Sequence, residues 1–146
     1  MAEPTAYADA QAQNDISRNV RQYKDLDLFF DKKNVSKDIT KLTDIAAVKR
    51  SIRNLVLTNH YEKPFHPEIG SGVRDVLFEN MTPITAHILT KKIEMVIENF
   101  EPRARLINVR ASPNLDRNEY ECTISFYVVN TPTELVDLTV FLERLR

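Results

Sequence analysis

The stretch at residues 82–112, TPITAHILTKKIEMVIENFEPRARLINVRAS, decides the fold because a helical pattern gives way to a strand pattern within a few residues. Thr82 supplies a capping hydroxyl and Pro83 suits a first helical turn, so we expect a helix from this point to about Phe100. At residues 105–112 two sets of side chains then alternate with a period of two, which predicts a strand.

The predicted helix is apolar on more than one side. Its main apolar row consists of Ala86, Leu89, Ile93, Val96, Ile97 and Phe100. Ile84, Ile88 and Met95 form a second row, rotated away from the first. A helix with two apolar sides is covered on both, by its own sheet and by another element or a partner. We expect the second row to be buried within the monomer, with a partner surface as the alternative.

The last third of the chain predicts further strands. One strand face is formed by Tyr120, Cys122, Ile124, Phe126 and Val128, after a turn at residues 113–118. The C-terminal segment is less clear-cut, since Val136, Leu138, Val140 and Leu142 alternate like a strand, whereas Leu135, Leu138, Leu142 and Leu145 fit a helical stripe. The β-branched residues and the alternation favour a strand.

Upstream, residues 23–30 (YKDLDLFF) alternate like a strand, and residues 35–40 predict a second strand after a turn at 31–34. A helix should begin at the cap Thr43 and end near Asn59. Its apolar stripe consists of Ile45, Val48, Ile52 and Leu55. A loop should occupy residues 60–69 and a short helix residues 73–78.

This order of elements predicts an α+β fold, with two main helices packed on a mostly antiparallel or mixed sheet in one domain at residues 22–146. Residues 1–21 lack a sustained apolar face, which predicts a flexible N-terminal arm, and a terminus without a role is the alternative.

The composition argues against several classes of function. The chain has 146 residues and a net charge of −1, so we expect binding neither to nucleic acid nor to an anionic membrane. No apolar run approaches the ~20 residues of a membrane span, and the polar N-terminus is unlike a secretory signal. The single cysteine, Cys122, excludes an internal disulfide framework and fits folding in a reducing cytoplasm.

The sequence does not predict a catalytic or metal site. His60, His66 and His87 are scattered, so we expect no metal and no cofactor, and Cys122 fits a core residue better than a nucleophile. The acids Glu68, Glu79 and Glu101 are conceivable members of a glycosidase pair. An arginine two residues after Glu101 favours its ionised form, however, which is the wrong state for a general acid.

Two motifs distinguish the chain. The first is YEKPFHPEIGSGVRDVLFE at residues 61–79, and the second is Glu101-Pro102-Arg103 directly after the long helix. In the first motif we expect a structural loop formed with Phe65, Pro67, Gly70, Gly72, Phe78 and Glu79. Together with the early DLDLFF, these motifs resemble the baseplate wedge family of contractile tails, over residues 23–142. Members of that family start the tail sheath in phages, a related subunit serves type VI secretion machines, and the family carries a "lysozyme-like" label.

The resemblance implies a fold similar to the interlocking domain of sheath subunits and a structural role rather than an enzymatic one. It implies that Glu101, Pro102 and Arg103 dock on a helical bundle of wedge proteins, and that sheath subunits add extended arms to the sheet of this chain. The implied partners are the tail sheath subunit, wedge proteins and other baseplate subunits, with six copies of the chain in a ring of a virion baseplate that is assembled in the host cytoplasm. A type VI secretion counterpart and a peptidoglycan-degrading lysozyme are the alternatives.

The residues of the second motif suit a docking corner. Pro102 interrupts the helix, so the chain must turn after Phe100. Arg103 offers a planar fork of donors for carboxylates or for carbonyls at a helix C-terminus. The alternative from the residues alone is an internal ion pair between Glu101 and Arg103 that ties the helix to the following strand.

Overall fold

The computed structural model describes residues 23–28 and 39–144. The elements in chain order are β1 (Lys24–Leu26), β2 (Lys41–Thr43), α2 (Asp44–Leu57), α3 (Val73–Leu77), α4 (Pro83–Phe100), β3 (Ala104–Asn114), β4 (Glu119–Val128) and β5 (Thr131–Glu143). The predicted arm at residues 1–21 and the predicted turn at 31–34 lie outside the described residues.

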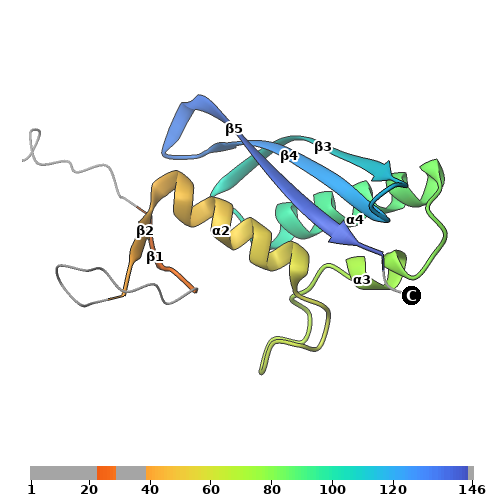
Figure 1. The fold of residues 1–146 in the computed structure, drawn as a ribbon. Coiled ribbons are helices and arrows are strands. Elements are labelled where there is room, and N and C mark those ends of the chain that lie inside the picture. The colour runs from red at the N-terminus through yellow and green to blue at the C-terminus, as the bar shows by residue number, and fades with distance from the viewer. Residues whose placement is uncertain (1–22, 29–38, 145–146) are drawn as a thin grey trace, which may run out of the picture.

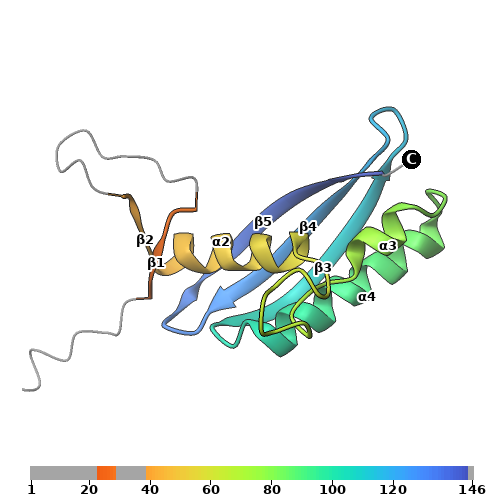
Figure 2. The ribbon, with the colours of Figure 1, turned by 90° about the horizontal axis from the view of Figure 1, so that it is seen from below.

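One antiparallel sheet with the order β3-β4-β5 forms the centre of the fold. The helices α2 and α4 lie on one face of it, as Figures 1 and 2 show from two directions. The predicted α+β class is therefore confirmed, and this sheet is purely antiparallel. The C-terminal segment is a strand, as predicted, because its alternating face of Val136, Val140 and Leu142 is buried against the helices.

The first two strands do not join the main sheet. β1 and β2 pair with each other in a separate antiparallel ribbon of three residues each. Most of the expected second strand at residues 35–40 lies outside the described residues. Of its last two residues, Ile39 forms an isolated β-bridge, and β2 follows at Lys41–Thr43 and runs directly into α2. Asp44 fixes the ribbon at the start of that helix: its amide donates to the Tyr23 carbonyl at 2.8 Å, and its carboxylate accepts from the Tyr23 amide at 3.1 Å.

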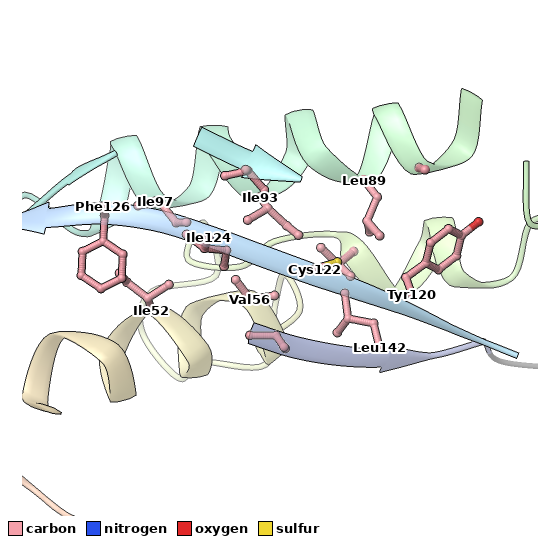
Figure 3. Packing of buried hydrophobic residues seen from close by; sticks show 14 of the residues in the cluster. Ile52, Val56, Leu89, Ile93, Ile97, Tyr120, Cys122, Ile124, Phe126 and Leu142 are labelled. Carbon is pink, nitrogen blue, oxygen red and sulfur yellow. The ribbon is translucent and has the colours of Figure 1, made fainter. Parts of the chain in front are cut away.

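The core lies between the sheet and the two long helices. The five predicted inward residues of β4 (Tyr120, Cys122, Ile124, Phe126 and Val128) are all fully buried. Figure 3 shows the first four of them between Leu89, Ile93 and Ile97 of α4 and Ile52 and Val56 of α2. In α2 the buried stripe consists of Ala47, Val48, Ile52 and Val56. Two of the four residues expected in this stripe, Ile45 and Leu55, lie at its margins and are only half-buried.

The start of α4 follows the predicted signal. Thr82 has extended backbone and its hydroxyl accepts a hydrogen bond from the Thr85 amide at 3.2 Å. Thr43 precedes α2 with similar backbone but makes no side-chain cap. The main apolar row of α4 is buried, apart from a half-buried Phe100.

The second apolar row of α4 is exposed, and the expectation of burial within the monomer is wrong. Ile84 is 74%, Ile88 40% and Met95 62% exposed. The reason is geometric: the sheet and α2 pack against the opposite side of α4, and among the described residues no further layer covers the outer side.

Candidate functional site

The corner after α4 consists of Glu101, Pro102 and Arg103, and it joins the longest helix to β3. The Glu101 amide still donates to the Ile97 carbonyl at 2.9 Å, which closes the last helical turn. The Ala104 amide donates to the Glu101 carbonyl at 3.1 Å, so the chain reverses within three residues. Pro102 lies exposed at the apex of this corner. The helix thus ends where the proline was expected to end it.

Glu101 and Arg103 form a two-pronged ion pair within the chain. Arg103 Nε donates to Glu101 Oε1 at 2.6 Å, and Arg103 Nη2 donates to Oε2 at 2.8 Å. The Glu101 side chain is only 2% exposed, whereas that of Arg103 is 26% exposed. The internal ion pair that was the alternative from the sequence is therefore present. The Glu101 carboxylate finds its hydrogen-bond donors within the chain and needs none from another protein. Docking by this corner stays a prediction, and it would rest on Pro102 and on the outward part of the Arg103 guanidinium.

Two further side chains, which the sequence did not single out, complete the corner. The Ser51 side chain of α2 helps to lower the pKa of Glu101, and the Arg103 guanidinium carbon lies 5.5 Å from the centre of the Tyr23 ring. No local pattern connects residues so far apart in sequence, so only the folded structure could reveal them. The corner therefore links four separate segments: the β1 region, α2, the end of α4 and the start of β3.

The pKa of Glu101 reflects two opposing effects. Burial alone would raise the pKa of this carboxyl, but the hydrogen bonds from Arg103 and Ser51 outweigh burial and hold its pKa below the usual range. In turn, the hydrogen bond to Glu101 raises the pKa of Arg103, so both groups are charged at neutral pH. A carboxyl held ionised in this way is suited to structural pairing and unsuited to donating a proton.

The predicted structural loop connects α2 to α3. Gly72 has a φ of +56°, which side chains disfavour, and caps α3. Gly70 presses against the backbone of Asn59 and His60, where a Cβ atom would lie only 2.4 Å from two backbone atoms. Between them, the Ser71 hydroxyl donates to the Val56 carbonyl at 2.7 Å. Lys92 of α4 donates to the Gly72 carbonyl at 3.0 Å, which secures the loop to the long helix.

The other loop residues lie at the surface. Phe65 and Pro67 are exposed, as are Phe78 and Glu79 at the end of α3. The loop leaves α2 at its C-terminal end, while the corner lies against Ser51 in the middle of that helix. A surface hollow of about 560 Å³ runs along α2, with Asp25 and Ser51 among its lining residues and Lys63 and Pro64 contributed by the loop.

The three acids considered for glycoside hydrolysis lie in three separate parts of the fold. Glu68 is on the exposed loop beside His66, Glu79 follows α3, and Glu101 is buried at the corner. The backbone amide of Glu68 and the His66 ring lower the pKa of Glu68, so this acid also favours the ionised form. Burial raises the pKa of the Cys122 thiol to about 12, which makes it a poor nucleophile.

The described residues contain neither a metal-binding cluster nor a membrane-spanning helix. Within residues 23–28 and 39–144, no group of three or more His, Cys, Asp or Glu side chains is arranged to hold a metal ion. In the same part of the chain, no helix is both long enough and apolar enough to cross a membrane.

The sheet has two free margins in the described part of the chain. β4 is central, so the outer edges of β3 and β5 have no strand beside them among these residues. The sequence alone did not identify which strands lie at the edges, because alternation reveals the face of a residue but not the order of the strands.

Comparison with known proteins assigns a family. Residues 43–133 match the family model of baseplate wedge protein gp25. The baseplate wedge protein gp25 of Enterobacteria phage T4 is 33% identical over 100 residues, which cover 68% of this chain and 76% of that protein.

Two solved structures share the fold of this chain. A crystal structure from Geobacter sulfurreducens, described provisionally as a tail lysozyme, has a TM-score of 0.63 at 24% identity, over 68% of this chain and 89% of that one. A chain in the six-fold symmetrised cryo-EM structure of the anti-feeding prophage baseplate has a TM-score of 0.59 at 20% identity, over 86% of this chain and 88% of that one. From the family match and the relative in phage T4, this chain belongs to the family of baseplate wedge protein gp25.

Proposed function

We propose that this chain is a structural, non-enzymatic wedge subunit of a contractile-tail baseplate, and that it starts polymerisation of the tail sheath. Its membership of the gp25 family and the likeness of its fold to a baseplate chain support the baseplate role. In this role it works among other baseplate subunits, in several copies around the tail axis. Its partners would be the sheath subunit on one side and helical wedge proteins on the other.

The observation that carries the sheath-starting role is an open edge on a well-packed sheet. An exposed edge presents unpaired N–H and C=O groups, which proteins normally cover or blunt. An extended arm of another subunit can add to such an edge as a further strand, with backbone hydrogen bonds supplying affinity. If the added subunit then offers a similar edge to the next one, the contact propagates into a tube instead of closing.

Of the two free edges, that of β5 is the better acceptor. β5 keeps an unbroken register with β4 from the pair Tyr127–Leu135 to the pair Glu119–Glu143. β3 is interrupted by a register shift between Leu106 and Asn108, and it carries Pro113 near its end. Bulges and prolines are two of the devices that blunt an edge. β5 also has both, a register shift opposite Tyr127 and Val128 and a proline at position 132, but they lie at its beginning. They leave nine consecutive pairs with β4, against seven in β3 after its own shift, so β5 keeps the longer regular ladder.

Pairs of proline variants test this assignment. Of two consecutive amides in an edge strand, one points to the neighbouring strand and the other points outward. In the pair Leu138→Pro and Thr139→Pro, one variant should unfold, and the other should fold but fail to recruit sheath. The matched pair on β3 is Arg110→Pro and Ala111→Pro, of which the folded member should still support sheath growth. Normal sheath on baseplates that carry the folded β5 variant would reject strand addition at β5.

The second part of the proposal is docking on the wedge through the corner. Because Arg103 already binds Glu101, a loss of assembly in Arg103→Ala could reflect a weaker fold. Pro102 is exposed and has no amide N–H, so Pro102→Ala changes the apex while leaving the ion pair in place. We expect folded Pro102→Ala and Arg103→Lys proteins to join the wedge poorly. If both variants were incorporated into the wedge at the wild-type level, the docking role would be rejected and the corner would have only a structural role within the chain.

A lysozyme is the second candidate because one structure of similar fold is described provisionally in those terms. A turbidity assay on purified cell walls decides the matter. We expect no clearing by the purified chain. Clearing that Glu68→Gln, Glu79→Gln or Glu101→Gln abolishes would make it an enzyme. A type VI secretion counterpart with the same structural role is distinguished by whether the assembled particle carries a phage tail.

A further inference from the structure

The connection between α2 and α3 projects away from the helices and the sheet (Figure 1). We call residues 59–69 the aromatic finger. Its side chains from Tyr61 to Glu68 are all exposed, and two of them are large and apolar: Phe65 is 97% and Tyr61 86% exposed. Phe65 is therefore almost entirely outside the protein, where a phenylalanine contributes nothing to the core.

Both aromatic residues have an unfavourable backbone conformation. The φ angle of Tyr61 is +68° and that of Phe65 is +67°. Residues with a side chain rarely adopt this left-handed region, which glycine enters without penalty. The two glycines of the chain are at positions 70 and 72, and aromatic residues occupy the two strained positions. Such strain persists only where the surroundings impose it, and it is concentrated at functional sites.

Hydrogen bonds within the finger impose the shape. The Tyr61 amide donates to the Pro67 carbonyl at 3.0 Å, which closes the finger at its base. The Glu62 carboxylate accepts from the backbone amide and from the side-chain amide of Asn59, both at 2.9 Å. His66 pairs with Glu68 at 3.1 Å. The finger is thus ordered by its own polar groups, and the Phe65 ring is held outward before any partner arrives.

An aromatic ring that is exposed and already ordered has the properties of an interface anchor. Large aromatic side chains dominate the binding energy of interfaces when they enter desolvated pockets. An ordered loop also loses less conformational entropy on binding than a floppy one. The charged groups of the finger are Glu62, Lys63 and Glu68, which give a slight negative excess. This excess disfavours anionic lipid and nucleic acid, both of which attract basic surfaces.

We propose that Phe65 anchors this chain in an apolar pocket of a different protein subunit of the particle, with Tyr61 packing at the rim of that pocket. The identity of the neighbour as a baseplate subunit rests on the proposed function. A second copy of the chain is a poorer partner. The hollow of about 360 Å³ beside Leu77 and Phe141 is lined by charged groups such as Arg74 and Glu143 as well as by apolar side chains. Asn59 and Glu62, at the base of the second copy's own finger, also line it and would obstruct an incoming finger.

Replacement of Phe65 by glycine separates anchoring from folding. Phe65→Gly removes the ring and relieves the strained backbone, so the melting temperature of the purified chain should stay the same or rise. Its affinity for the subassembly that receives wild-type protein should fall roughly 30-fold, the loss expected for a hot-spot side chain. The matched control is Leu115→Gly, since Leu115 is 74% exposed in the turn after β3, and this variant should bind like wild type. Wild-type affinity of Phe65→Gly would overturn the proposal.

A photo-crosslinking amino acid at position 65 identifies the pocket in assembled particles, with position 115 as the control. We expect cross-links from position 65 to a cluster of apolar residues on one other subunit. Cross-links to a second copy of this chain, or yields no higher than from position 115, would overturn the inference while leaving the proposed function intact. Wild-type particles that contain no copy of this chain would reject both.

Discussion

Replacing Arg103 by alanine should destabilise the chain in a pH-dependent manner. Glu101 is buried, and two of its hydrogen bonds come from the arginine, at 2.6 and 2.8 Å. Removing one partner of a buried ion pair typically costs ~3–5 kcal/mol. Arg103 is itself 26% exposed, so water screens part of the interaction, and the expected loss in free energy of unfolding at pH 7 is ~2–4 kcal/mol.

The pH dependence follows from the lowered pKa of Glu101. A carboxyl whose pKa is lower in the folded state stabilises the fold above its unfolded pKa of 4.5, and that stabilisation is lost as the pH falls through the folded pKa. In Arg103→Ala the carboxyl remains buried without its main partner, so its folded pKa should rise. The deficit of the variant should therefore be largest at pH 7. It should begin to shrink as the pH falls through the raised folded pKa of the variant, above 4.5, and should go on shrinking towards the lowered folded pKa of the wild-type chain.

Urea unfolding at several pH values measures the effect, with Arg105→Ala as the control because Arg105 is exposed on β3. Glu101→Gln should cost less than Arg103→Ala, since the remaining arginine can reach water. A deficit of Arg103→Ala that stays constant from pH 7 to pH 4, or that is no larger than that of Arg105→Ala, would refute the reasoning about the corner.

Three further outcomes are expected. Phe126→Ala should lower the free energy of unfolding by ~3–5 kcal/mol, because Phe126 is fully buried between α2 and the sheet. Tyr127→Ala, on the opposite face of β4, should cost much less. Equal losses of the two variants in thermal unfolding would contradict this assignment of faces. Gly70→Ala should lower the melting temperature more than Gly72→Ala does. A Cβ atom added at Gly70 would meet rigid backbone, whereas one added at Gly72 would meet the mobile end of the Lys92 side chain. The reverse order of melting temperatures would count against the loop packing. Cys122 should resist a thiol reagent at pH 8 and react on unfolding in urea, because burial raises its pKa to about 12; rapid labelling of the native chain would show otherwise.

Local patterns predicted the elements whose buried face repeats regularly. The alternation from Tyr120 to Val128 identified β4 and its inward face, and Thr82 with Pro83 identified the first turn of α4. The ambiguous C-terminal segment was settled in favour of a strand by its β-branched residues, and this prediction is confirmed. In each case the element could be predicted from neighbouring residues, because burial of one face makes apolar residues recur at the period of the strand or the helix.

Features that depend on distant contacts were predicted less well. The outer row of α4 was expected to be buried, but an apolar stripe does not reveal whether its cover belongs to the same chain. The sequence offered both a docking surface and an internal ion pair for the corner, and the structure shows the ion pair, together with Ser51 and Tyr23, which no local pattern indicates. The exposure of Phe65 was also missed, since a phenylalanine in a loop is compatible with either packing or projection.

The most direct test of the central claim is a reconstruction of an assembled particle that contains this chain. We expect a strand from a neighbouring subunit to be hydrogen-bonded along the outer edge of β5, and helices of another subunit to lie against Pro102 and Arg103. A baseplate in which both sheet edges face solvent and the corner touches no other subunit would contradict it.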